Sequence, residues 1–182
     1  MKRIVIGVIA ALGLFGKSFA YESLNLIDDE SLSRELNLTQ FSRADIISFS
    51  ETKNGDSTVR LVPRESNNSG DKKSIIYTAR IASVSSGPKI VFKTGETCRE
   101  GNSYEMVIRI KDQNVKALND CGKDDGGNLV NVFLILTDAG MDYTVRQFID
   151  KNYVPVQFND RIIPFSAAGF REAWDDFGQP AL

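Results

Sequence analysis

The longest nearly unbroken apolar run after the first twenty residues is Leu129–Thr137. It is too short to span a membrane, and it is rich in β-branched and aromatic side chains. Turn-forming residues bracket it, with Gly126-Gly127 before it and Asp138-Ala139-Gly140 after it. These features predict a strand that is buried on both faces and around which the rest of the chain is arranged.

Alternating apolar and polar positions elsewhere predict antiparallel strands joined by short turns. Asn54-Gly55 and Asn159-Asp160 are tight hairpin signals. Apolar and polar residues alternate along Tyr104–Lys111, which is typical of an antiparallel strand with one face exposed to solvent. We expect Asp112-Gln113-Asn114 to form the turn that follows this strand. The expected strands are Ala44–Phe49, Thr58–Val62, Ile75–Val84, Lys89–Lys93, Tyr104–Lys111, Val115–Cys121, Leu129–Thr137, Val154–Phe158 and Arg161–Phe165.

Two C-terminal stretches have helical spacing. The apolar positions of the first are Met141, Val145, Phe148 and Ile149. Those of the second are Phe170, Ala173, Trp174 and Phe177. We expect Asp138 or Asp142 near the start of the first helix and Ser166 as the N-cap of the second. Trp174 lies on an apolar helix face, which favours a place in the core over a ligand-binding role.

Two segments in the first half of the chain contribute less to the expected core. Glu30–Leu36 has acidic residues ahead of two leucines at helical spacing, which predicts a short helix. Glu65–Lys73 contains no apolar residue and is expected to be an exposed, mobile loop. The order of elements predicts an α+β fold: a mostly antiparallel β-sheet or sandwich with two C-terminal amphipathic helices packed on it.

The first twenty residues fit a secretory signal peptide. A basic start is followed by an apolar stretch of about a dozen residues and by small residues at Ser18 and Ala20, so we expect cleavage after Ala20. The alternative, a permanent anchor, is disfavoured because so short a run does not cross a hydrocarbon core of about 30 Å. The sequence thus predicts a cleaved signal peptide of bacterial type over residues 1–20 and a single β-rich globular domain over residues 21–182. We expect this domain to be periplasmic or secreted.

Charge and composition then narrow the function. Removal of residues 1–20 takes away three cations and changes the formal charge from −2 to −5. An acidic domain without a basic cluster argues against nucleic acid and against stable membrane association as partners. The chain contains no histidine, which excludes Ser-His-Asp and Cys-His nucleophiles and most catalytic zinc sites. We therefore expect a protein that is not an enzyme and that has no cofactor.

The two cysteines, Cys98 and Cys121, are expected to form a disulfide, because an exported chain meets an oxidising compartment. By closing the loop between the two cysteines, this disulfide would stabilise the fold by about 3 kcal/mol in the chain-entropy model. A redox-active pair is the alternative, but the spacing is not Cys-x-x-Cys. Asp120, Asp124 and Asp125 have the oxygen ligands that calcium prefers, yet they lack the spacing of a calcium loop, so we expect a solvated turn and no metal.

The polar residues beside the two cysteines are the candidate binding surface. They are Arg99, Glu100, Lys123, Asp124 and Asp125. Loops held on a rigid scaffold are where binding residues usually lie. The sequence predicts an exported, non-catalytic binding protein whose partner is another envelope or secreted protein, for example an inhibitor or immunity protein. The alternatives are a component of an envelope or secretion apparatus, completed at an exposed edge strand, and a hydrolase that uses two carboxylates.

Overall fold

The computed structural model describes residues 45–51, 55–63, 74–85, 87–124 and 126–177. These residues form nine strands and two helices. The strands are β1 (Asp45–Glu51), β2 (Ser57–Pro63), β3 (Ile75–Val84), β4 (Gly87–Thr94), β5 (Ser103–Ile110), β6 (Gln113–Lys123), β7 (Leu129–Ile135), β8 (Tyr153–Phe158) and β9 (Arg161–Ser166). The helices are α2 (Asp138–Asp150) and α3 (Phe170–Asp176). The expected signal peptide, the helix Glu30–Leu36 and the loop Glu65–Lys73 lie outside the described residues.

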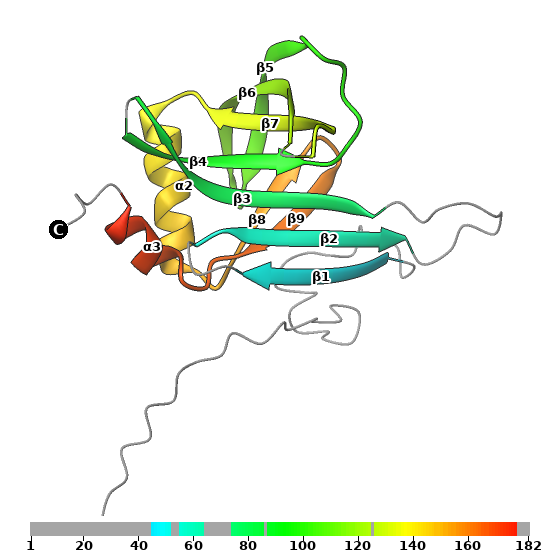
Figure 1. The fold of residues 1–182 in the computed structure, drawn as a ribbon. Helices are drawn as coiled ribbons and strands as arrows, with labels where there is room; N and C mark the ends of the chain where they lie inside the picture. The colour runs from blue at the N-terminus through cyan, green and yellow to red at the C-terminus, as the bar shows by residue number, and fades with distance from the viewer. Residues whose placement is uncertain (1–44, 52–54, 64–73, 86, 125, 178–182) are drawn as a thin grey trace, which may run out of the picture.

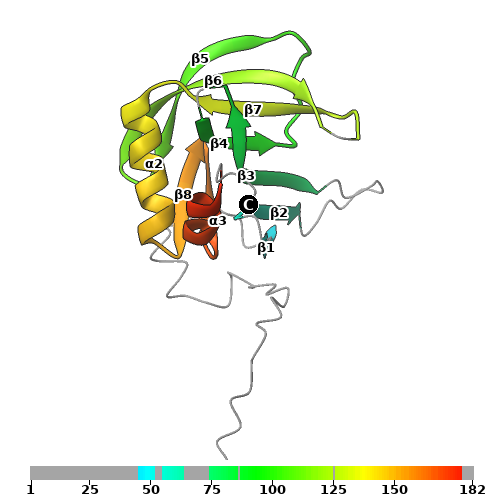
Figure 2. The same ribbon diagram turned by 60° about the vertical axis from the view of Figure 1, so that its left-hand side comes forward.

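All nine strands belong to one sheet in the order β1-β2-β3-β4-β7-β6-β5-β8-β9, and every neighbouring pair is antiparallel. The sheet curves until β9 contacts β2, and β8 and β9 pass behind β3 and β2 in Figure 1. Strands β2 to β9 therefore form a nearly closed, barrel-like sheet (Figure 2). The expected α+β, antiparallel fold is confirmed, as a single curved sheet.

Two prolines lie where neighbouring strands of the nearly closed sheet share few backbone hydrogen bonds. Pro155 of β8 and Pro164 of β9 lie opposite each other, and neither has an N–H to donate. Pro155 accepts a hydrogen bond from Lys111 N at 2.8 Å but returns none, so the ladder between β8 and β5 stops on that side. In the other direction the ladder stops at Arg109 and Gln157, because β8 ends at Phe158. Pro164 has no N–H on the side of β9 that faces β2. Among the described residues β9 contacts β2 there, but the two strands form no ladder of backbone hydrogen bonds.

The apolar run of the sequence forms β7, the middle strand of the nine. It ends at Ile135, and Thr137 is the N-cap of α2, where its Oγ1 accepts a hydrogen bond from Gly140 N. Phe133 and Ile135 are fully buried inside the curved sheet, whereas Val132 and Leu134 on the outer face are only half-buried. The expectation of burial on both faces holds only in part, because on the outer face Val130 is 7% exposed whereas Val132 and Leu134 keep partial exposure.

The interior is continuous from the sheet to the helices. α2 runs across the strands at the end of the sheet where β4 starts (Figure 1) and buries Met141, Val145 and Phe148 in the core. Phe170 of α3 lies 5.0 Å from Phe148, measured between ring centroids, and Trp174 stacks on Phe170 at 5.7 Å. We call this end of the sheet the helix end.

Two local expectations were wrong. Ser166 was expected to cap α3, but it ends β9, and Gly169 in the left-handed conformation (φ 72°) precedes the helix instead. The turn after β5 consists of Lys111 and Asp112, because Gln113 already pairs with Ile110. In both places a strand continues further than its sequence pattern, since pairing with a neighbouring strand extends it.

Candidate functional site

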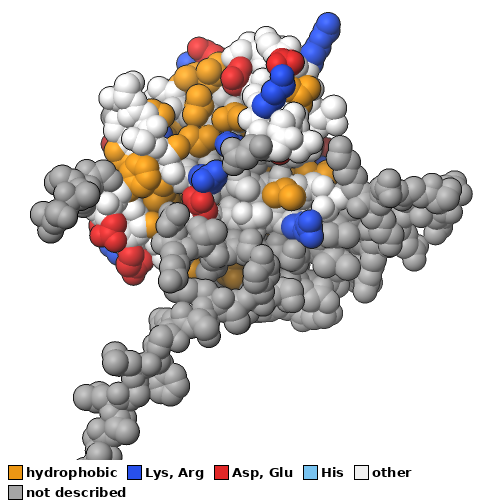
Figure 3. Space-filling model, in the orientation of Figure 1, with side chains coloured by type: hydrophobic (Ala, Val, Ile, Leu, Met, Phe, Trp, Pro, Cys, Tyr) orange, Lys and Arg blue, Asp and Glu red, His pale blue; other side chains and the backbone are white. Residues whose placement is uncertain are grey.

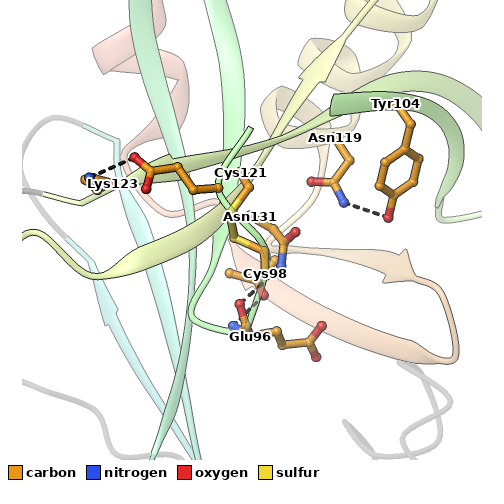
Figure 4. Close-up of a disulfide and its surroundings, with 9 residues drawn as sticks. Glu96, Cys98, Tyr104, Asn119, Cys121, Lys123 and Asn131 are labelled. Atoms are coloured by element: carbon orange, nitrogen blue, oxygen red, sulfur yellow. Dashed lines mark hydrogen bonds and ion pairs between the residues drawn. A yellow bond between two sulfur atoms is a disulfide. The ribbon is translucent and has the colours of Figure 1, made fainter. Parts of the chain in front are cut away.

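The end of the sheet opposite the helices is formed by the segment 94–103, the end of β6, the start of β7 and the turn between β8 and β9. We call it the disulfide end, because Cys98 and Cys121 lie there with their sulfur atoms 1.99 Å apart and their Cα atoms 5.8 Å apart (Figure 4). The expected pairing of the two cysteines is the one the structure contains. The bond ties the loop before β5 to β6, and Cys121 N donates to Asn102 O at 3.1 Å beside it.

A buried tyrosine links three segments at this end. Tyr77 on β3 is fully buried, and its hydroxyl donates to Glu96 Oε1 at 2.7 Å. Arg161 at the start of β9 donates from Nη1 to Tyr77 Oη at 3.3 Å and lies 3.6 Å from Glu96 Oε1. Burial, together with the neighbouring Glu96 carboxylate, raises the pKa of Tyr77 well above its ordinary value. The hydroxyl therefore stays protonated and connects the two sides of the sheet across its incomplete closure.

The backbone of the loop is held as well as its side chains. Asn131 of β7 donates from Nδ2 to Glu96 O at 3.2 Å, and Thr94 Oγ1 accepts from Glu96 N at 3.1 Å. The loop that carries Glu96 and Cys98 is thus attached to β3, β6, β7 and β9. Its outer residues are presented on a fixed backbone rather than on a free loop.

The structure brings some of the predicted binding residues together. Lys123 Nζ lies 2.8 Å from Glu100 Oε1, and both side chains are more than half exposed. Arg99 is exposed on the same loop, and its carbonyl accepts a hydrogen bond from Asn102 N. Asp124 does not join this pair, and Asp125 lies outside the described residues. Within the described part of the chain, the candidate surface therefore contains the Glu100–Lys123 ion pair and the exposed Arg99 rather than a five-residue cluster.

Asp124 has a local structural role. Its Oδ1 accepts hydrogen bonds from Gly126 N and Asn128 N at 2.9 and 2.8 Å, and Asn128 Nδ2 bonds to the same carboxylate. The Asn128 side chain, followed by these backbone donors, holds the pKa of Asp124 below its usual value. The hydrogen bonds of Asp124 thus close a local turn, and the expected absence of calcium there stays a prediction. Within the described residues no group of three acidic or cysteine side chains is placed to hold a metal ion.

A second polar pair lies on the inner face near the same end. Asn119 of β6 is buried and donates from Nδ2 to Tyr104 Oη at 3.0 Å (Figure 4). Tyr104 itself is 45% exposed. The buried Oδ1 of Asn119 has no partner among the described protein atoms.

Sequence reasoning missed most of this polar set. The residues it did not select are Tyr77, Glu96, Tyr104, Asn119, Asn131 and Arg161. One signal was present: Asn131 is a polar residue inside the apolar run of β7, and a buried amide requires a hydrogen-bond partner. The other residues are separated along the chain by as many as 84 positions, from Tyr77 to Arg161, and only the curvature of the sheet brings them together.

Apolar side chains continue from the interior onto the outer surface. Val91, Leu134 and Leu118 are cross-strand neighbours on the outer faces of β4, β7 and β6, where Val91 is buried and the two leucines are half-buried. Val107 of β5 is 55% exposed. We call these four residues the outer stripe. Figure 3 shows hydrophobic side chains in the upper part of the visible face, where β4, β6 and β7 lie, with charged side chains between them.

Neither helix in the described part of the chain is long and apolar enough to cross a bilayer. Comparisons with protein-family models, curated proteins and solved structures find no match to this chain. The residues of the disulfide end and of the strands beside it are therefore the candidate functional site.

Proposed function

We propose that the chain is an exported, non-catalytic binding protein that engages another envelope or secreted protein through its disulfide end, in the manner of an inhibitor or immunity protein. The observation that carries this proposal is the fixed presentation of the loop 95–102. Cys98 is bonded to Cys121, and the loop backbone is bonded to Asn131. A rigid loop loses little conformational entropy on binding, so its exposed charges contribute more to affinity.

The exposed side chains on this end fit a protein partner better than a small ligand. Tyr104 is a half-exposed aromatic, and Arg99 is an exposed cation; Tyr and Arg are enriched at the energetic centres of protein interfaces. The Glu100–Lys123 pair beside them lies in solvent. Such a pair contributes little to folding, and it is therefore available to set the orientation of a partner.

The experiment reverses the charge pattern while it keeps the ion pair. The double variant Glu100→Lys/Lys123→Glu keeps opposite charges at these two positions, whose wild-type side chains lie 2.8 Å apart, but exchanges their signs. The wild-type chain is used to capture a partner from the envelope of its own organism, and the partner is identified by mass spectrometry and purified. The affinity of this partner for the wild-type chain and for the double variant is then measured. We expect the exchange to weaken binding by at least about tenfold, with an unchanged unfolding midpoint.

The helix end offers a matched control. Arg171 and Asp150 form an ion pair of 3.7 Å with side chains 57% and 61% exposed, close to the 56% and 65% of Lys123 and Glu100. Exchange of this pair, Arg171→Asp/Asp150→Arg, should leave the affinity unchanged. Equal affinity of all three proteins for the captured partner would contradict the proposal.

The assembly alternative predicts a different behaviour in the cell. An inhibitor should migrate alone or as a stoichiometric pair, whereas an apparatus component should fractionate with membranes or with a large complex. Fractionation of the native envelope therefore separates these two candidates before any partner is known.

A further inference from the structure

One edge of the nearly closed sheet is open beside the disulfide end. β8 pairs with only Arg109 and Ile110, the last two residues of β5. On its other side β5 is paired with β6 along its whole length, from Ser103 to Ile110. Among the described residues no strand continues the β8 ladder toward the start of β5, which lies at the top of the molecule in Figure 1.

The direction of the backbone groups on this edge follows from two contacts. Ile110 and Gln113 close a two-residue turn, so the backbone groups of Ile110 and of every second residue before it point to β6. Lys111 N points the other way, to Pro155 O. The N–H and C=O groups of Ser103, Glu105 and Val107 are therefore directed at the open side. We call these three residues the β5 edge.

The β5 edge has few of the features that usually protect a free strand. Edge strands are normally short, or carry proline, a bulge or several charges. Here Glu105 is the single charge among the three residues, and Val107 is 55% exposed. The start of the strand is also held in place, because the disulfide and the Cys121–Asn102 hydrogen bond attach it to β6.

The side chains around the edge indicate which segment would complete it. A strand residue opposite Val107 would lie on the outer face, where it would extend the outer stripe. A residue opposite Met106 would lie on the inner face beside Met106, which is half-buried, and Tyr104. A residue opposite Glu105 would face a carboxylate, which favours a lysine or arginine.

We propose that the β5 edge accepts an extended segment of the partner protein as an added antiparallel strand, with a cation opposite Glu105 and apolar residues opposite Met106 and Val107. The antiparallel direction is that of β8, which already pairs with the same edge of β5. Main-chain hydrogen bonds to the three edge residues supply affinity, and the alternating side chains supply specificity. This inference rests on the proposed function, because it states how the protein partner binds.

The test uses a synthetic probe and the oxidised full chain. The peptide acetyl-Val-Leu-Lys-Phe-Thr-amide places Val opposite Val107, Lys opposite Glu105 and Thr opposite Ser103 in antiparallel register. N-methylation of its Lys nitrogen removes a donor that would face the β5 edge. N-methylation of its Leu nitrogen alters a group that would point away from the edge and serves as the matched control.

We expect the parent peptide and the N-methyl-Leu peptide to bind and to slow amide exchange at Glu105 and Val107. The N-methyl-Lys peptide should bind at least about tenfold more weakly. Glu105→Pro should abolish peptide binding and leave the fold intact, since this N–H makes no bond to β6, whereas Glu105→Gln should keep most of the affinity.

Three results would overturn the inference: no saturable binding of the parent peptide, equal binding of the two methylated peptides, or unchanged exchange at the edge amides. Its failure is distinguishable from failure of the proposed function. If the natural partner is lost on exchange of Glu100 and Lys123 but is retained by Glu105→Pro, the partner uses the loop surface and not the edge.

Discussion

The two ends of the nearly closed sheet are closed by different kinds of interaction. At the helix end α2 and α3 cover the strands with large apolar side chains, and Phe148 contacts Phe170 and Phe92 with centroid distances of 5.0 and 6.3 Å. At the disulfide end a covalent bond, the Tyr77–Glu96–Arg161 contacts and the bonds to Asn131 hold the loop. Burial of aromatic rings dominates the first end, although its surface carries single contacts such as Arg171–Asp150 at 3.7 Å. A covalent bond and several hydrogen bonds to one loop dominate the second end.

This difference matters for binding. Apolar burial is non-directional and approximately proportional to area, so it does not by itself fix the position of one exposed side chain. A disulfide and hydrogen bonds at stated atoms do fix such positions, including those of the loop that carries Arg99 and Glu100. The helix end is therefore held mainly by apolar burial, and the fixed loop of the disulfide end is the surface that we propose for recognition.

The largest expected effect is loss of an aromatic ring from the helix end. Phe148→Ala removes a side chain that is 2% exposed and packed between β4 and α3. We expect the free energy of unfolding to fall by about 3–5 kcal/mol, as measured by urea denaturation. Tyr104→Ala at the disulfide end removes a half-exposed ring and should cost much less. Similar losses in both variants would contradict the division between the two ends.

Removal of the disulfide is the next largest change. The double variant Cys98→Ala/Cys121→Ala opens a loop with a sequence separation of 23 residues, which in the chain-entropy model lowers the free energy of unfolding by about 3 kcal/mol. We also expect faster amide exchange in residues 95–105 than in α2, because the loop loses its covalent attachment. Uniformly faster exchange over the whole chain would show that the bond has no local role.

Much of the local structure could be predicted from the sequence, because alternation and turn chemistry act over short distances. The expected strand Ile75–Val84 has the bounds of β3, and Asn159-Asp160 joins β8 and β9 as a two-residue turn. The cysteine pairing could also be predicted, from the expected oxidising compartment and from the presence of only two cysteines in the sequence. These features depend on neighbours in the sequence or on a choice with one possible answer.

Closure of the sheet could not be predicted in the same way. It requires β4 to pair with β7 and β5 to pair with β8, and no short-range pattern specifies these choices. Consequently the Tyr77–Arg161 contact and the β5 edge were not foreseen as parts of one site. Pro155 and Pro164 were the available clues, since a proline marks a strand side on which the ladder is incomplete. Their meaning depends on which strand lies beside them.

The smallest expected effect concerns the polar closure itself. Tyr77→Phe removes the hydroxyl that donates to Glu96 Oε1 at 2.7 Å and should lower the free energy of unfolding by about 1–2 kcal/mol at neutral pH. Tyr143→Phe is the matched control at the helix end, where the hydroxyl donates to Asp112 Oδ1 at 2.6 Å on the surface. Its effect should be smaller, because both groups of that pair are accessible to water when the bond is lost.

The pH dependence gives an independent readout of the same variant. The pKa of Tyr77 is raised above the ordinary 10.0 by burial and by Glu96, so the folded state holds this proton more tightly than the unfolded state. The stabilisation by the hydroxyl is therefore complete below pH 10 and is lost as the pH rises from there toward the raised pKa. The difference in unfolding free energy between wild type and Tyr77→Phe should narrow in the same range. A constant difference from neutral to strongly alkaline pH would show that the hydroxyl does not hold the two sides of the sheet together.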